Sequence, residues 1–69
     1  MPYVHIRITP DGATRERKER LIRGVTDLLV AELDKDPATT FVVIEEVETD
    51  NWGVAGQSVT RRRQDAVQR

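Results

Sequence analysis

"TTFVVIEEV", residues 39–47, is the stretch that decides the fold of this 69-residue chain. Its centre, residues 41–44, is apolar at every position, which is typical of a β-strand buried on both faces. The segment "DKDP" comes just before it, and Pro37 cannot continue a helix. We therefore predict a strand over residues 39–47 that lies centrally in a sheet.

An amphipathic helix is predicted upstream, from Thr14 to residue 33. Thr14 suits the N-cap position, because its hydroxyl can accept a hydrogen bond from an unpaired backbone N–H. Gly24 lies inside the helix, where it costs about 1 kcal/mol relative to Ala, and suggests close packing at that point. The apolar residues recur at spacings of three and four and form one stripe: Leu21, Ile22, Val25, Leu28, Leu29 and Leu33.

A second strand is predicted at residues 3–8, "YVHIRI", where apolar and polar residues alternate. Strand, helix and strand in this order form a βαβ unit with parallel strands and a right-handed crossover. Residues 48–58 are rich in turn formers and predict a short C-terminal hairpin or turn. The expected fold class is α/β, with one domain over residues 1–69 and a flexible tail over residues 61–69.

The length of the chain predicts self-association. A domain of this size buries only about 60% of its unfolded surface, and the chain has no cysteine to form a disulfide. A two-stranded sheet is marginal in water, and one helix covers only one of its faces. We therefore expect a homo-oligomer that extends the sheet.

Composition excludes several classes of partner. The net charge of −1 does not suggest nucleic-acid binding, and the single histidine without cysteine excludes a closed Cys/His zinc site. No apolar run approaches the roughly 20 residues of a membrane span, and the N-terminus lacks a signal-peptide pattern. We expect a cytoplasmic protein with no metal and no membrane partner.

Pro2 is the first candidate site residue. When Met1 is removed, its nitrogen becomes a secondary amine that can take and return a proton, and apolar surroundings or nearby cations would bring its pKa towards neutrality. Alternatively, Pro2 has only a structural role. A proline is tolerated at the first residue of a strand, because the N–H that it lacks is not needed there.

Two further features are candidates for a binding site. Trp52, in "NWGVAG", either walls a pocket or fills a hydrophobic gap, and Gly53 and Gly56 let the backbone pass close to another group. The cluster Arg61, Arg62 and Arg63 is either a solvated tail or a source of bidentate contacts to a carboxylate.

Together these features resemble the 4-oxalocrotonate tautomerase family: "MP" before a strand, "RERKERLIRGVTDLL" as helix, "FVVIEEV" as second strand, then "NWGVAG". The resemblance implies a cofactor-free tautomerase in which Pro2 moves a proton in 2-hydroxydienoates or enol forms of 2-oxo acids. It implies that Trp52 lines the substrate pocket with Val54 nearby. It also implies a dimer or hexamer whose neighbouring subunits complete each site.

The chain departs from this family at two positions. The loop "TPDGAT" has Ala13 near the place of a catalytic arginine, and the second strand has Phe41 where an arginine is usual. Arg61 and Arg62 are the predicted substitutes that bind substrate, with Arg7 and Arg15 as further candidates.

Two other classes of function stay open at this point. A relative with the same fold adds water to, or dehalogenates, a short unsaturated acid, with a protonated Pro2 as acid. Glu45, Glu46 or Glu48 would then activate water. The other class is a non-catalytic oligomeric binding protein, which the missing arginines favour.

Overall fold

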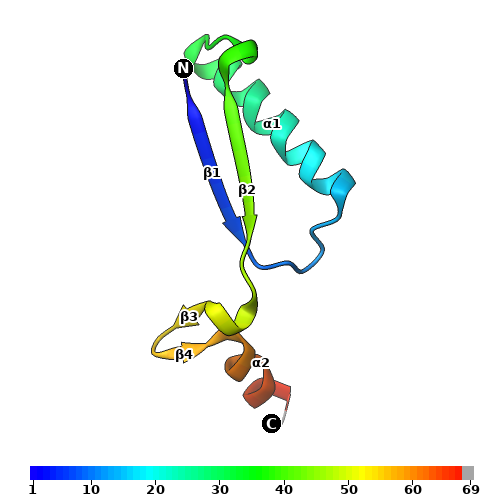
Figure 1. Ribbon diagram of the computed structural model, residues 1–69, viewed down its shortest axis with the longest axis vertical. Coiled ribbons are helices and arrows are strands. Elements are labelled where there is room, and N and C mark those ends of the chain that lie inside the picture. Colours follow the sequence, from blue (N-terminus) through cyan, green and yellow to red (C-terminus); the bar gives the residue numbers. More distant parts are fainter. Residues whose placement is uncertain (68–69) are drawn as a thin grey trace.

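The computed structural model describes residues 1–67 as a βαβ unit followed by a small hairpin and a second helix (Figure 1). The predicted α/β fold is confirmed. β1 and β2 pair in parallel, with Tyr3 opposite Phe41 and Ile8 opposite Glu46. In chain order the elements are β1 (Tyr3–Ile8), α1 (Arg15–Leu33), the 3₁₀ turn η1 (Pro37–Thr39), β2 (Phe41–Glu46), the 3₁₀ turn η2 (Thr49–Asn51), β3 (Gly53–Val54), β4 (Gln57–Ser58) and α2 (Val59–Val67).

α1 begins as the sequence predicts. The hydroxyl of Thr14 accepts a hydrogen bond from the backbone N–H of Arg17 at 3.2 Å. The helix ends at Asp34, whose left-handed φ of 54° turns the chain away and whose N–H donates to the carbonyl of Val30. A Cβ added at Gly24 would meet nothing within 4 Å, so the close packing expected there does not occur within the described chain.

β2 is shorter than predicted. Asp36 caps the turn η1 by accepting from the N–H of Ala38 at 2.9 Å, which draws Thr39 into the turn. The strand therefore starts at Phe41 rather than Thr39 and ends at Glu46 rather than Val47. The expected burial on both faces is also not found, since every second residue of β2 is exposed.

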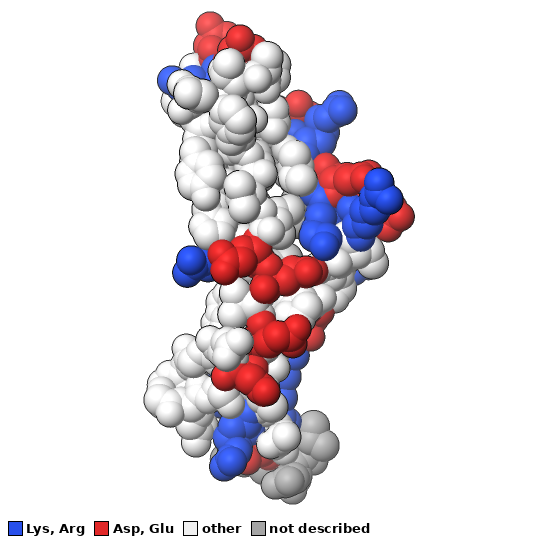
Figure 2. Space-filling view, in the orientation of Figure 1, with Lys and Arg blue, Asp and Glu red and all other residues white. Residues whose placement is uncertain are grey.

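The helix α1 covers only one of the two faces of the sheet. α1 packs on β2, and the inward residues Val4, Ile6, Val42 and Ile44 are half-buried. On the other face Tyr3, Phe41 and Val43 are 63%, 52% and 44% exposed. Uncharged side chains cover the region of β1 and β2 in Figure 2, whereas charges gather over α1.

The isolated chain has an incomplete core. None of the described residues is fully buried. The solvent-accessible surface is 5515 Å², against about 4,400 Å² for a compact monomer of this size. The radius of gyration is 16.0 Å, against about 11 Å for a compact domain of this length.

The C-terminal part confirms the predicted hairpin and changes the predicted tail. β3 and β4 pair antiparallel around a two-residue turn in which Ala55 and Gly56 both have positive φ, 54° and 83°. Residues 61–67, expected as part of a flexible tail, instead belong to α2. Ser58 caps that helix by accepting from the N–H of Arg61 at 3.1 Å, and arginine, glutamine and alanine are good helix formers. Residues 68–69 of the predicted tail lie outside the described residues. Neither described helix is long and apolar enough to cross a membrane.

Candidate active site

Pro2 lies at the amino end of the β1–β2 ladder. Its carbonyl accepts a hydrogen bond from the N–H of Phe41 at 3.0 Å, which fixes the backbone next to its ring nitrogen. Pro2 is half-buried, and Met1 in front of it is 86% exposed. The start of the chain is therefore held by β2 while the residue before Pro2 projects into solvent.

Trp52 lies at the other end of the ladder, where it caps η2. Its N–H donates to the carbonyl of Thr49, and its own carbonyl accepts from the N–H of Val59 at 2.8 Å. The half-buried Trp52 side chain lines an open depression of about 250 Å³. The other lining residues are Arg7, Val47, Asn51 and Gly53.

The described chain does not bring Pro2 and Trp52 together. Pro2 precedes β1, whereas Trp52 follows the carboxyl end of β2, and the two strands are parallel (Figure 1). Six residues of strand separate the two ends, which is about 20 Å. A site that uses both residues has to combine two copies of the chain.

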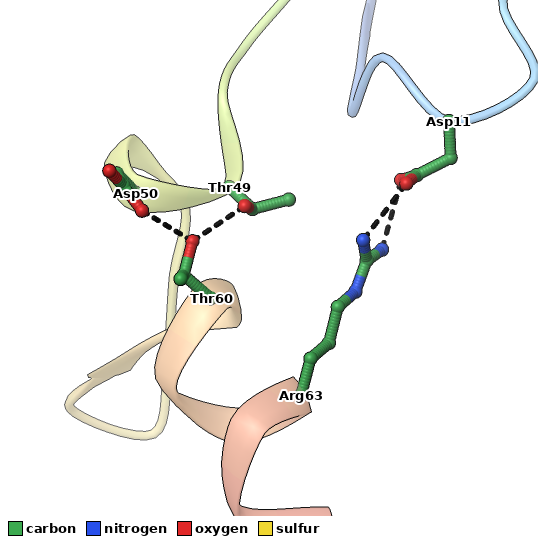
Figure 3. A network of polar contacts seen from close by, with 5 residues as sticks. All are labelled: Asp11, Thr49, Asp50, Thr60 and Arg63. Carbon is green, nitrogen blue, oxygen red and sulfur yellow. Dashed lines mark hydrogen bonds and ion pairs between the residues drawn. The ribbon is translucent and has the colours of Figure 1, made fainter. Parts of the chain in front are cut away.

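α2 is fixed to the rest of the chain by one arginine of the predicted cluster. Both terminal nitrogens of Arg63 donate to the carboxylate of Asp11 at 2.9 Å (Figure 3). Hydrogen bonds from Arg63, and then from Thr9, hold the pKa of the Asp11 carboxyl well below its usual range, and the pair raises the pKa of Arg63. Arg63 therefore has a fixed partner within the chain. The interpretation of the cluster as a solvated tail did not predict this contact.

A second contact fixes α2 to η2. The hydroxyl of Thr60 lies 2.6 Å from the hydroxyl of Thr49 and donates to Asp50 at 2.5 Å (Figure 3). Since a hydroxyl has one proton to donate, Thr49 is the donor in the first of these bonds. The hairpin with Trp52 is thus held between η2 and α2.

Arg61, Arg62 and Val54 lie in the same part of the chain as Trp52 and are exposed. Arg62 lines a separate groove with Gln57 and Asp65. These residues therefore lie on β3 and α2 near Trp52, but none of them lines the Trp52 depression, and Pro2 lies at the far end of the ladder.

Two of the three glutamates that could activate water, Glu45 and Glu46, are already paired, and Glu48 is exposed. Glu45 lies 3.0 Å from His5 Nε2 and accepts from Arg7, and Glu46 accepts from Lys18 at 3.4 Å. Within residues 1–67, no group of three or more His, Asp or Glu side chains is arranged to hold a metal ion.

Another groove, of about 540 Å³, lies between the β1–α1 loop and α1. Ala13 lines it, and so does Arg17, which donates to the carbonyl of Gly12 at 3.0 Å. Arg17 thus reaches back over the loop in which the sequence has no arginine, but it is held by the backbone there.

Comparison with known proteins identifies the family. The family model described as "Tautomerase enzyme" matches residues 2–62. "Probable tautomerase K2" of Dickeya dadantii (strain 3937) is 67% identical over 66 residues, which cover 96% of this chain and 98% of that protein. The crystal structure of DmpI from Helicobacter pylori is similar with a TM-score of 0.85 and 43% identity, covering 91% of this chain and 97% of that one. A "2-hydroxymuconate tautomerase" of Comamonas testosteroni is 36% identical over 58 residues, covering 84% and 90% of the two chains.

The chain belongs to the Tautomerase family. It is an isomerase of the 4-oxalocrotonate tautomerase type, as the resemblance in the sequence predicted. The structural neighbour shares its βαβ arrangement over nearly the whole length.

Sequence reasoning missed two features of the site. It treated Arg7 only as one of several substitutes, because nothing in the sequence places it beside Trp52. It also missed α2, although Ser58 before a run of good helix formers is an N-terminal signal for a helix.

Proposed function

We propose that this tautomerase, after removal of Met1, uses the nitrogen of Pro2 as the general base on enol forms of 2-oxo acids and on 2-hydroxydienoates. The observation that carries the proposal is the position of Pro2. Its carbonyl is tied to β2 through Phe41 and the preceding Met1 is exposed, so trimming would leave a positioned secondary amine. The similarity to a protein named 2-hydroxymuconate tautomerase supports this substrate class.

The site is expected to form between copies of the chain. A two-fold axis joins equivalent strand edges in antiparallel orientation. If the free edges of two β1 strands join in this way, the amino end of one β1 lies beside the carboxyl end of the other. Pro2 of one copy then approaches the Trp52 depression of a second copy, which removes the separation of about 20 Å seen within one chain.

The exposed face of the sheet supports assembly independently. Tyr3, Phe41 and Val43 form an apolar surface that a monomer leaves in water. Covering it adds the burial that the isolated chain lacks, so the oligomer, a dimer or a hexamer made of three dimers, is the expected active form.

The proposed reaction moves one proton. The neutral amine of Pro2 takes the proton of the 2-hydroxyl, and the oxygen's electron pair forms the C2 carbonyl. The electrons of the former double bond take the same proton back from Pro2 at C3, or at C5 in a dienoate. The indole of Trp52 and the side chain of Val54 exclude water, which disfavours the charged ammonium and keeps Pro2 basic near neutral pH.

A cation is needed where the negative charge develops on oxygen. Arg61 and Arg62 are exposed on α2, which adjoins Trp52 through the hydrogen bond of Val59. We propose that they contribute to holding the anionic substrate at the mouth of the site.

The test compares three forms of the protein, each verified by intact mass: the processed chain, Pro2→Ala after processing, and a chain that retains Met1. Phenylenolpyruvate is the substrate, and sedimentation confirms the same assembly in each. Both altered forms are expected to lose at least a hundredfold in kcat/KM, because one changes the amine and the other makes it an amide. Equal turnover by the chain that retains Met1 would show that the amine plays no part.

A further inference from the structure

One positively charged residue, Arg7, lines the Trp52 depression. Arg7 lies on the open face of the sheet, and its side chain lines the depression together with Trp52, Val47, Asn51 and Gly53. Arg7 and Trp52 are 45 positions apart in the sequence, and the parallel pairing of β1 and β2 and the turn η2 place both at the same depression. An aromatic residue and an arginine thus line the same depression.

The geometry of Arg7 leaves its anion-binding end available. Its Nε donates to Glu45 Oε2 at 3.3 Å, and the same oxygen lies 3.0 Å from Nε2 of His5. Within residues 1–67, the two terminal nitrogens of Arg7 have no hydrogen-bond partner, and the side chain is 64% exposed. Glu45 therefore holds the Arg7 side chain through Nε, and the two terminal nitrogens stay available to an anion.

Three other arginines are engaged elsewhere, whereas Arg61 and Arg62 are exposed on α2 and do not line the Trp52 depression. Arg63 is bound by both terminal nitrogens to Asp11, and Arg17 donates to the carbonyl of Gly12. Arg15 pairs with Glu19 on the exposed side of α1, away from Trp52.

We propose that Arg7 binds the carboxylate of the substrate in the Trp52 depression, and that Glu45 positions it for this role. The planar fork of a guanidinium matches a carboxylate with two parallel hydrogen bonds, whereas the ammonium of lysine does not. The class of ligand is an anionic 2-oxo or 2-hydroxy acid whose hydrocarbon part lies against the indole. The proposal rests on the proposed function, because it places Pro2 of a second copy at this same depression.

The kinetic test uses two substrates that differ only at the carboxyl group: phenylenolpyruvate, which is charged there, and its methyl ester, which is neutral. Arg7→Met should raise KM for the acid at least tenfold while changing KM for the ester less than twofold, since a charge-assisted bidentate contact is lost only with the acid. Arg7→Lys should recover only part of the loss, because it keeps the charge without the fork. Glu45→Gln should raise KM for the acid by a smaller factor. Arg23→Met, at an exposed position of α1, is the matched control and should leave KM for both substrates unchanged.

A binding measurement separates this inference from the proposed function. Trp52 is the only tryptophan, so its fluorescence reports ligand binding without any turnover. Phenylpyruvate should change the emission of the wild-type chain saturably, and Arg7→Met should weaken that binding at least tenfold while binding of the methyl ester stays the same. If this pattern holds in a protein that shows no turnover, the proposed function fails and the role of Arg7 stands.

Two results would overturn the inference. One is an Arg7→Met variant, assembled like the wild type, that binds phenylpyruvate with unchanged affinity. The other is a variant that loses acid and ester equally, because a purely structural role of Arg7 in the sheet would affect both ligands alike.

Discussion

Val43→Lys should prevent the chain from assembling. Because the isolated chain has an incomplete core, the loss of assembly should also prevent stable folding. The chain exposes 5515 Å², about 1,100 Å² more than a compact monomer of this size. Somewhat more than half of that excess surface is expected to be apolar. At roughly 25 cal/mol per Å² of apolar surface, burying it would contribute about 16 kcal/mol. That value reaches the whole stability of an ordinary domain, about 5–15 kcal/mol. Covering the open face is therefore expected to decide whether the chain folds.

Val43 lies opposite His5 on that face and is 44% exposed. Val43→Ala should cost about 1 kcal/mol per copy, from the burial lost on assembly. Val43→Lys places an ammonium in the covered face, at a cost of several kcal/mol per copy. In a symmetric dimer the two costs combine, so the dissociation constant should rise by roughly ten thousandfold.

Sedimentation velocity and circular dichroism between 1 and 50 µM protein provide the assay, at concentrations chosen to bracket assembly. Ala31→Lys, on an exposed position of α1, is the matched control and should sediment like the wild type. A Val43→Lys variant with wild-type sedimentation and an unchanged thermal midpoint would refute the reasoning, because the open face would then not be an interface.

Two further predictions concern parts of the chain outside the sheet face. Asp11→Asn should release α2 and speed hydrogen exchange of its amides, whereas Asp65→Asn, an exposed change on α2, should not. Because the pKa of Asp11 in the folded chain lies below its usual range, its contact with Arg63 is complete above the unfolded value of about 3.9 and is lost only as the pH falls through the lower folded value. The protection that this contact gives the amides of α2 should therefore be constant between pH 5 and 8. Gly24→Ala should raise the free energy of unfolding by up to about 1 kcal/mol, since the added methyl meets nothing within 4 Å, and a lower thermal midpoint would indicate a close neighbour from another copy.

Local patterns predicted the βαβ unit well. Alternation in residues 3–8 and the three-and-four spacing after Thr14 act within a few residues, so β1 and α1 have the predicted bounds. The start of β2 was misplaced because the cap made by Asp36 competes with the strand for Thr39. The burial of β2 was misjudged for a different reason. In the proposed assembly its second apolar face is covered by other copies, and the sequence does not distinguish such a surface from one covered within a single chain.

Only the site residues that belong to a recognisable sequence motif were predictable. Pro2 and Trp52 are marked by their own neighbours in the sequence. The pair of Asp11 and Arg63 joins residues 52 positions apart, and the shared depression of Arg7 and Trp52 depends on how η2 follows the sheet. Contacts of this kind depend on the tertiary arrangement, and composition carries no signal for them.

The incomplete core and the divided site have one physical origin. A chain that forms a single parallel strand pair places the two ends of that pair about 20 Å apart, so one copy cannot bring Pro2 to Trp52. The same pair leaves one face and both edges uncovered. In the proposed assembly, an antiparallel joining of two β1 edges would bring Pro2 beside the Trp52 depression of the other copy and would pair one free edge, whereas the open face would be covered by a second contact between copies. It follows that a change on the open face, such as Val43→Lys, should remove folding and activity together. Arg7→Met should instead remove recognition of the acid while leaving assembly intact, so these two variants separate the part of the interface that builds the protein from the part that binds its substrate.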